Sequence, residues 1–136
     1  MPSMILVNLS INNMKIAIFG LGRMGSQIVR KLHEGGHTVI VSNRSPGLVD
    51  EMKKLGMIGA YTKEEVISSF GNDQVVIWLM VPSDVVDSEL ETWLELIPKG
   101  SILIDGGNSK WSDTKRREEV VKKQESTLID IGTSGG

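Results

Sequence analysis

The sequence predicts an α/β fold in which a doubly wound, mostly parallel sheet lies between two layers of helices. Short runs rich in Ile and Val alternate along the chain with longer amphipathic segments. Continuous apolar runs of this length are typical of strands buried on both faces, and regular strand–helix alternation is typical of a parallel sheet. Right-handed crossovers then put the ligand crevice at the carboxyl ends of the strands.

Five segments are predicted as strands, and a sixth is a weaker candidate. The five are residues 14–20, 37–43, 74–81, 101–107 and 127–132, and the weaker one is 57–61. Each is followed by a turn or a helical pattern, except the last, which is followed only by the glycine-rich end of the sequence. The predicted fold is therefore a three-layer α/β/α arrangement, with the sheet in the middle layer.

Five helical segments separate the strands. They are expected to begin near Arg23, Pro46, Lys63, Asp84 and Ser112 and to end near Gly35, Leu55, Phe70, Ile97 and Gln124. Thr62 with Glu65 is a capping-box pattern, Ser83 is placed to cap the fourth helix, and Ser45 before Pro46 is placed to cap the second. The basic and acidic run KRREE at 115–119 is interpreted as a solvated helix face.

Composition excludes several classes of protein. The chain has 136 residues, a net charge of -2 and no cysteine, which fits one domain of a cytoplasmic protein without disulfides or thiolate metal sites. A nucleic-acid partner and a membrane span are not expected, because there is neither a basic surplus nor an apolar run of roughly 18 residues. Residues 1–13 are expected to be a poorly ordered leader and residues 14–136 the folded domain.

The glycine spacing in GLGRMG at 20–25 predicts dinucleotide binding. The motif follows a strand and opens a helix, the context in which G-x-G-x-x-G is informative. Gly20 permits a tight turn, Gly22 allows close approach of a pyrophosphate, and Gly25 allows the helix to pack on the strand. The predicted cofactor-binding residues here are Gly20, Leu21, Gly22, Arg23, Met24 and Gly25.

The end of the second strand favours NADP over NAD. An NAD site usually carries Asp or Glu there to accept hydrogen bonds from the ribose 2′-hydroxyl, but this chain has Asn43, Arg44 and Ser45. Arg44 offers a cationic fork for a 2′-phosphate. The alternative is a polar loop that only caps the next helix, and both interpretations can hold together.

Two polar segments follow later strands and are expected at the same crevice. IDGGNS at 104–109 carries Asn108, whose side chain suits a carboxamide or a sugar hydroxyl, and the chain finishes with Ser134, Gly135 and Gly136, which could hold an oxyanion. Taken alone, each of these segments is equally compatible with a turn.

The motifs GLGRMG, NRS, IDGGNS, DTKRRE and SGG, in this order, resemble the N-terminal coenzyme domain of 6-phosphogluconate dehydrogenase (decarboxylating). The resemblance covers about residues 14–136. The runner-up is a 3-hydroxyisobutyrate-type β-hydroxyacid dehydrogenase, which usually carries a different motif after the fifth strand. The chain has VPSDVV at 81–86, where members of the resembled family often have an Ala-Gly pair.

The resemblance implies roles for residues at matching positions. It implies NADP as cofactor, with Val81, Pro82 and Ser83 beside it, and no metal. It implies that Asn108 touches both nicotinamide and substrate, and that Ser134, Gly135 and Gly136 bind 6-phosphogluconate. The implied reaction is oxidation and decarboxylation to ribulose 5-phosphate.

The resemblance also implies that catalytic residues are absent from this sequence. In the family the lysine base and glutamate acid follow the SGG motif, together with a helical domain that builds a homodimer. His33, His37 and Lys110 are interpreted as surface residues rather than a general base. The isolated chain is therefore expected to be inactive, and a non-catalytic NADP(H)-binding module is the alternative function.

Overall fold

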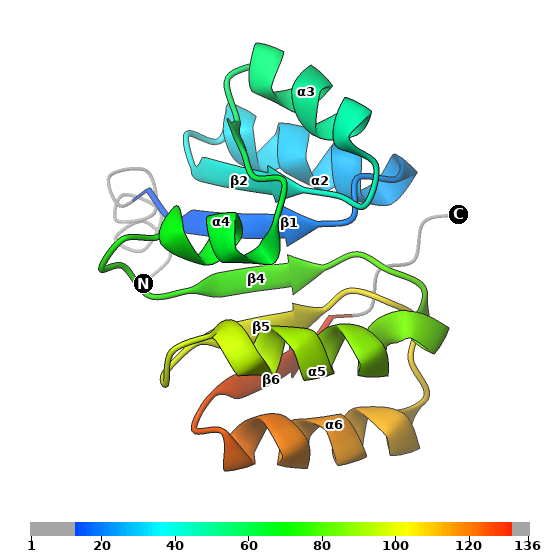
Figure 1. The fold of residues 1–136 in the computed structure, drawn as a ribbon. Helices are drawn as coiled ribbons and strands as arrows, with labels where there is room; N and C mark the ends of the chain where they lie inside the picture. The colour runs from blue at the N-terminus through cyan, green and yellow to red at the C-terminus, as the bar shows by residue number, and fades with distance from the viewer. Residues whose placement is uncertain (1–12, 132–136) are drawn as a thin grey trace, which may run out of the picture.

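The computed structural model describes residues 13–131, which form a six-stranded sheet with helices on both faces (Figure 1). The strands are β1 (Lys15–Phe19), β2 (Thr38–Ser42), β3 (Ile58–Gly59), β4 (Val76–Leu79), β5 (Ile102–Asp105) and β6 (Thr127–Asp130). The helices are α2 (Arg23–Glu34), α3 (Pro46–Lys54), α4 (Lys63–Ser68), α5 (Val86–Leu96) and α6 (Trp111–Lys123), with a 3-10 turn η1 (Ser83–Val85). Residues 1–12 of the expected leader at 1–13, and the predicted oxyanion residues Ser134, Gly135 and Gly136, lie outside the described residues.

All six strands are parallel, in the order β3-β2-β1-β4-β5-β6. Ala17 of β1 pairs with Ile40 of β2 on one side and Ile77 of β4 on the other, so the strand order reverses at β1. This is the doubly wound, Rossmann-like topology predicted from the sequence, and the fold class is confirmed. The reversal between β1 and β4 leaves the crevice in which such sheets bind ligands.

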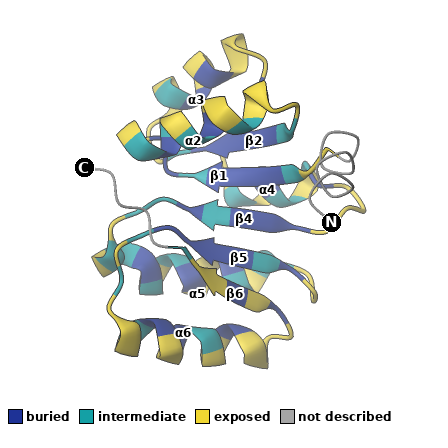
Figure 2. Cartoon of the chain, turned by 180° about the vertical axis from the view of Figure 1, so that it is seen from behind, coloured by how far each residue is buried: buried dark blue, intermediate teal, exposed yellow. Residues whose placement is uncertain are grey.

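The core consists of two apolar layers, one on each face of the sheet. Alternate strand residues point to opposite faces, so Ile16 and Ile18 pack toward α2 and α3, whereas Ala17 packs toward the other layer with α4, α5 and α6. Trp93 is fully buried in the second layer, with its ring edge-to-face against Phe19 at a centroid distance of 5.6 Å. Figure 2 shows the central strands buried along most of their length.

Helix starts agree with the sequence in position but not always in capping. The Thr62 hydroxyl accepts a hydrogen bond from the Glu65 amide at 3.1 Å, as the capping-box pattern predicted. Ser45 occupies the N-cap position of α3 with Pro46 first in the helix, but its side chain makes no capping bond. The prediction that Ser83 caps the fourth helix was wrong, because Ser83 begins the η1 turn and α5 starts three residues later.

Candidate functional site

The loops that follow β1, β2 and β4 meet at the carboxyl edge of the sheet. They form a cavity of about 330 Å³ lined by Phe19, Gly20, Gly22, Asn43, Arg44, Met80, Val81, Pro82, Val85 and Glu89. A larger cavity, about 540 Å³, lies at the opposite edge, between loops that precede β4 and β5. The smaller cavity is the functional candidate, because ligands of doubly wound sheets bind outside the carboxyl ends of the strands.

The glycine loop has the shape expected of a phosphate cradle. Gly20 has φ +106°, and a Cβ there would lie 2.2 Å from the Met80 carbonyl oxygen. A Cβ on Gly25 would lie 1.9 Å from the Gly20 oxygen, so α2 meets the end of β1 at this residue. By contrast, a Cβ on Gly22 would meet nothing within 4 Å and would point into open space.

Within residues 13–131, the amino end of α2 has neither a capping side chain nor an acidic residue in its first turn. Gly22 is the N-cap residue. The amides and the positive end of the helix dipole at Arg23 and Met24 therefore favour an anion. Arg23 is exposed and Met24 is half-buried beside this end.

The end of β2 is fixed to the glycine loop through Asn43. The Leu21 amide donates to the Asn43 side-chain oxygen at 2.8 Å, and the Asn43 amide group donates to the Ser45 carbonyl at 3.2 Å. Leu21 is buried in the core, whereas Arg44 and Ser45 are exposed at the rim. The structure thus brings the predicted residues of the glycine loop and of the β2 end into one site.

The remaining described site residues lie on two neighbouring loops. Val81 and Pro82 line the same cavity as Gly22 and Arg44. Ser83 is half-buried and Asn108 is exposed on the loop between β5 and α6. Asn108 is not among the lining residues of the cavity, so the structure does not bring it together with the glycine loop and Arg44.

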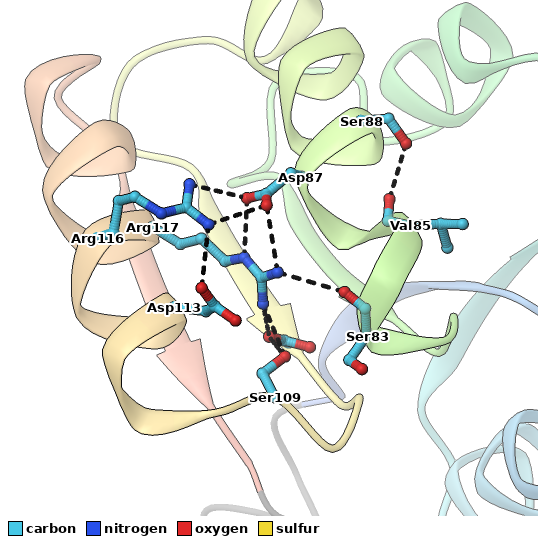
Figure 3. Close-up of polar contacts among 9 residues, drawn as sticks. Ser83, Val85, Asp87, Ser88, Ser109, Asp113, Arg116 and Arg117 are labelled. Atoms are coloured by element: carbon cyan, nitrogen blue, oxygen red, sulfur yellow. Dashed lines mark hydrogen bonds and ion pairs between the residues drawn. The ribbon is translucent and has the colours of Figure 1, made fainter.

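The sequence interpretation missed Arg117, whose guanidinium forms several polar contacts beside these loops. Arg117, within the KRREE run, has a side chain only 4% exposed, so the prediction of a solvated face was wrong at this residue. It lies on the same side of α6 as the buried residues Thr114 and Val121, and this helical spacing is the signal that could have identified it. Its partners are Asp87, Ser109 and the Ser83 carbonyl (Figure 3). Its Nη1 also lies 3.6 Å from the carboxylate of Asp105.

Asp87 on α5 accepts hydrogen bonds from two arginines of α6. Arg116 donates to its carboxylate at 3.1 and 2.9 Å, and Arg117 donates through Nε at 2.9 Å. These bonds hold the pKa of Asp87 well below its usual value, Arg116 contributing most. The carboxylate therefore stays ionised and joins α5 to α6.

The other candidates for chemistry do not gather at the crevice. His33 is exposed, and His37 accepts a hydrogen bond from the Met14 amide at 3.1 Å at the amino end of the sheet, as chain order predicted. Lys110 is exposed, and Trp111 is 74% exposed. Within residues 13–131, no group of three or more His, Cys, Asp or Glu side chains could hold a metal. In the same range, every helix is too short or too polar to cross a bilayer.

The fold and the site define a dinucleotide-binding α/β domain. Residues 15–136 match the sequence family described as the NAD binding domain of 6-phosphogluconate dehydrogenase, and the chain belongs to this family.

Individual relatives support this membership. The decarboxylating 6-phosphogluconate dehydrogenase of Haemophilus influenzae is 33% identical over 126 residues, which cover 89% of this chain and 26% of that protein. The solved 6-phosphogluconate dehydrogenase of Plasmodium falciparum, described as apo and in complexes with its cofactor NADP+ and its substrate 6-phosphogluconate, has a TM-score of 0.79 at 27% identity. The matched region covers 90% of this chain and 27% of the Plasmodium falciparum chain.

A second enzyme type shares the fold. The 3-hydroxyisobutyrate dehydrogenase of Mycobacterium tuberculosis also has a TM-score of 0.79, covering 92% of this chain and 42% of that one, at 21% identity. At that identity the likeness concerns the fold alone. The chain spans between 26% and 41% of the length of the curated relatives it matches.

Proposed function

We propose that this chain is the coenzyme-binding domain of an NADP-dependent, decarboxylating 6-phosphogluconate dehydrogenase. One observation carries the choice of NADP: the end of β2 beside the open Gly22 position has Asn43 and Arg44 and no carboxylate. A carboxylate at this point would hydrogen-bond a ribose 2′-hydroxyl and repel a 2′-phosphate. The guanidinium of Arg44 instead attracts the phosphate.

The residues around the crevice fit a dinucleotide. The pyrophosphate is assigned to the uncapped start of α2, from Gly20 through Leu21, Gly22, Arg23 and Met24 to Gly25, because Gly22 leaves space that a Cβ would occupy. The 2′-phosphate is assigned to Arg44, with Asn43 and Ser45 beside it. The nicotinamide end is assigned to Val81, Pro82, Ser83 and Asn108.

The substrate assignment follows the family. When bound, NADP+ supplies the hydride acceptor for oxidation of the C3 hydroxyl of 6-phosphogluconate, and loss of CO₂ from the β-keto acid gives ribulose 5-phosphate. Asn108 contacts this substrate, together with Ser134, Gly135 and Gly136. The general base and acid belong to the part of the relatives that this chain does not span, and the proposal includes a cytoplasmic homodimer formed through that part.

Calorimetric titration of the purified chain with NADP+ and NAD+ tests the proposal. NADP+ should bind at least tenfold more tightly, because a charge-assisted contact to the 2′-phosphate contributes about 1.5–3 kcal/mol. Arg44→Gln should remove this preference and leave NAD+ affinity within twofold. Arg30→Gln, on the exposed side of α2, is the matched control and should change neither affinity. Equal affinities for the two coenzymes would contradict the proposed choice.

A further inference from the structure

The guanidinium of Arg117 joins the two loops assigned to the nicotinamide end of the coenzyme. One segment, residues 81–83, follows β4 and enters the η1 turn, and the other, residues 106–109, follows β5. We propose that Arg117 is a positioning residue that holds these loops at a fixed spacing, so that Pro82 and Asn108 are preorganised around the nicotinamide. The inference rests on the proposed function and extends it to a residue on α6 that does not line the crevice.

Arg117 reaches both loops directly. Its Nη2 donates to the Ser83 carbonyl at 3.2 Å, and its Nη1 donates to the Ser109 hydroxyl at 2.7 Å. Nη1 also lies 3.6 Å from the carboxylate of Asp105, which is fully buried at the end of β5. Figure 3 shows the guanidinium between the Ser83 carbonyl on one side and Ser109 on the other.

The loop after β5 is further fixed by Asp105. One carboxylate oxygen accepts from the Gly107 amide at 2.9 Å, and the other accepts from the Ser109 hydroxyl at 2.8 Å. Asn108 lies between these two tethered residues, so its backbone position depends on Asp105. Because Arg117 supplies the cation beside this buried carboxylate, the tether and the arginine act together.

The two loops also touch without any help from side chains. A Cβ on Gly107 would lie 2.9 Å from the Val81 carbonyl oxygen and 3.7 Å from the Ser83 amide nitrogen. The two loops are therefore about as close as their backbones allow at Gly107. Arg117 joins them at Ser83 and Ser109, which lie a little further along each loop. A side chain of another shape at position 117 would leave the close contact at Gly107 intact. It would, however, remove the hydrogen bonds that hold the Ser83 carbonyl and the Ser109 hydroxyl.

Arginine suits this role better than lysine. A planar guanidinium donates in several fixed directions at once, and here it serves Asp87, Ser83 and Ser109. Lysine carries all its donors on one nitrogen atom, which cannot lie within hydrogen-bond distance of the three separated acceptors at once. Arg116 provides the contrast, since it is half-exposed and its partners among residues 13–131 are the carboxylates of Asp87 and Asp113.

The experiment compares two ligands that differ only in the nicotinamide base. The purified chain is titrated with NADP+ and with 2′-phospho-ADP-ribose, which is NADP+ without that base. The wild-type chain should bind NADP+ several-fold more tightly than 2′-phospho-ADP-ribose. Arg117→Lys should abolish this difference while the affinity for 2′-phospho-ADP-ribose stays within twofold, because the glycine loop and Arg44 are untouched.

Two further variants keep the test decisive. Ser109→Ala removes one acceptor of Arg117 without altering any charge, and should reduce the difference partly even if Arg117→Lys fails to fold. Arg116→Gln is the matched control and should leave the difference unchanged. Hydrogen exchange should accelerate in the loops after β4 and β5 in the Arg117 and Ser109 variants but not in the glycine loop.

The outcomes separate the two proposals. If the wild-type chain binds neither ligand, the proposed function fails. If it binds both equally, or if Arg117→Lys and Ser109→Ala retain the full difference, the coenzyme assignment stands and the positioning role of Arg117 is overturned. Equal weakening of both ligands in a folded variant would show a general structural effect and would also overturn it.

Discussion

The side-chain oxygen of Asn43 accepts a hydrogen bond from the Leu21 amide at 2.8 Å, and this bond ties the end of β2 to the glycine loop. The Gly20 amide also donates to the Ser42 carbonyl at 3.0 Å, so two consecutive bonds join the loop to the same strand end. Because the Leu21 side chain is buried, the loop is held on both its backbone and its side-chain sides. The glycine loop is therefore fixed in this shape by the end of β2, and Asn43, which we propose to lie beside the 2′-phosphate, is also the residue that holds the loop.

Replacing Asn43 with Asp should change coenzyme preference without loss of the fold. A carboxylate retains the acceptor for the Leu21 amide but adds a negative charge where the 2′-phosphate is proposed to bind. NADP+ affinity should fall about tenfold or more, whereas NAD+ affinity should be kept or improved, because a carboxylate accepts from the ribose hydroxyls. Calorimetry with both coenzymes measures the change.

The matched variant Asn43→Leu separates shape from charge. It removes the acceptor for Leu21 and should lower the free energy of unfolding by about 1 kcal/mol, measured in urea. Both coenzymes should then bind more weakly. Retention of NADP+ preference in the Asp variant would mean that the 2′-phosphate lies away from the end of β2.

The glycine loop offers a second prediction through two glycines with opposite surroundings. Gly25→Ala places a Cβ 1.9 Å from the Gly20 oxygen, a backbone atom at the start of the loop. This overlap should destabilise the domain by about 2–4 kcal/mol, since overpacking against backbone cannot be relieved by a rotamer change. Thermal unfolding followed by circular dichroism would detect it.

Gly22→Ala should behave differently. Gly22 has φ -67°, which alanine adopts without strain, and nothing lies within 4 Å of the new Cβ. Stability should change by less than about 0.5 kcal/mol, while affinity for both NADP+ and NAD+ should fall at least tenfold because the methyl group occupies pyrophosphate space. Unchanged coenzyme affinity in a stable Gly22→Ala chain would remove the cradle from the proposed site.

The order of strands and helices was predictable because it depends on hydrophobic periodicity. Buried runs such as 74–81 and 101–107 need only their own residues to be recognised, and even the short strand at Ile58–Gly59 fell within the weaker candidate 57–61. The roles of Gly20 and Gly25 were predictable from the motif, since a tight turn and a close helix contact are local requirements. Local signals therefore accounted for the fold and for the backbone shape of the glycine loop.

The polar network behind the crevice was not predictable in the same way. Arg117 is buried only because α5 places Asp87 opposite α6 and because β5 ends in Asp105. These three residues are distant in sequence, and a charged run on a helix is more often solvated. Ser83 was misassigned for a related reason, since its carbonyl is engaged by Arg117 in the η1 turn rather than its hydroxyl capping a helix.

A third prediction concerns the carboxylate pair at the ends of β5 and β6. Asp130 lies opposite Asp105 in the parallel register, and the pKa of Asp130 is raised by partial burial first and then by the charges of Asp105 and Glu118. Its proton is therefore held more tightly in the folded state, so stability is lost as pH rises from the usual range near 3.8 through the raised pKa. Asp130→Asn should stabilise the chain at pH 7 by a few tenths of a kcal/mol, because the site is largely solvated.

Urea unfolding at pH 7 and near pH 3.5 checks the sign. The stabilising effect of Asp130→Asn should shrink at the lower pH, where the wild-type carboxyl is mostly protonated in both states. Glu119→Gln, on an exposed position of α6, serves as the control and should show a smaller effect at pH 7. A destabilised Asp130→Asn chain at neutral pH would indicate that Asp130 gains more from Arg117 than it loses to the neighbouring acids.

The pKa of Asp87 is shifted in the opposite direction from that of Asp130, so its charge should stabilise the folded chain at neutral pH and cease to do so in acid. Hydrogen bonds from Arg116 and then Arg117 hold its pKa well below the usual 3.8, so the unfolded chain takes up the proton first as pH falls. Its contribution is complete above about pH 4 and is lost progressively below that value. Because the side chain is 49% exposed, solvent screening reduces the gain, and Asp87→Asn should cost about 1 kcal/mol at pH 7.

The unfolding free energies of the wild-type chain and Asp87→Asn should therefore approach each other progressively as pH falls from about 4 toward the folded-state pKa of Asp87, which lies well below 3.8. Asp84→Asn is the control, since Asp84 is an exposed carboxylate three residues earlier in the η1 turn. Binding of 2′-phospho-ADP-ribose at pH 7 should be unchanged in Asp87→Asn, because Asp87 joins α5 to α6 behind the crevice rather than contacting the glycine loop. A wild-type advantage that persists undiminished at pH 3 would mean that Asp87 stabilises the domain by packing and not by its charge, since only the charged form can be titrated away.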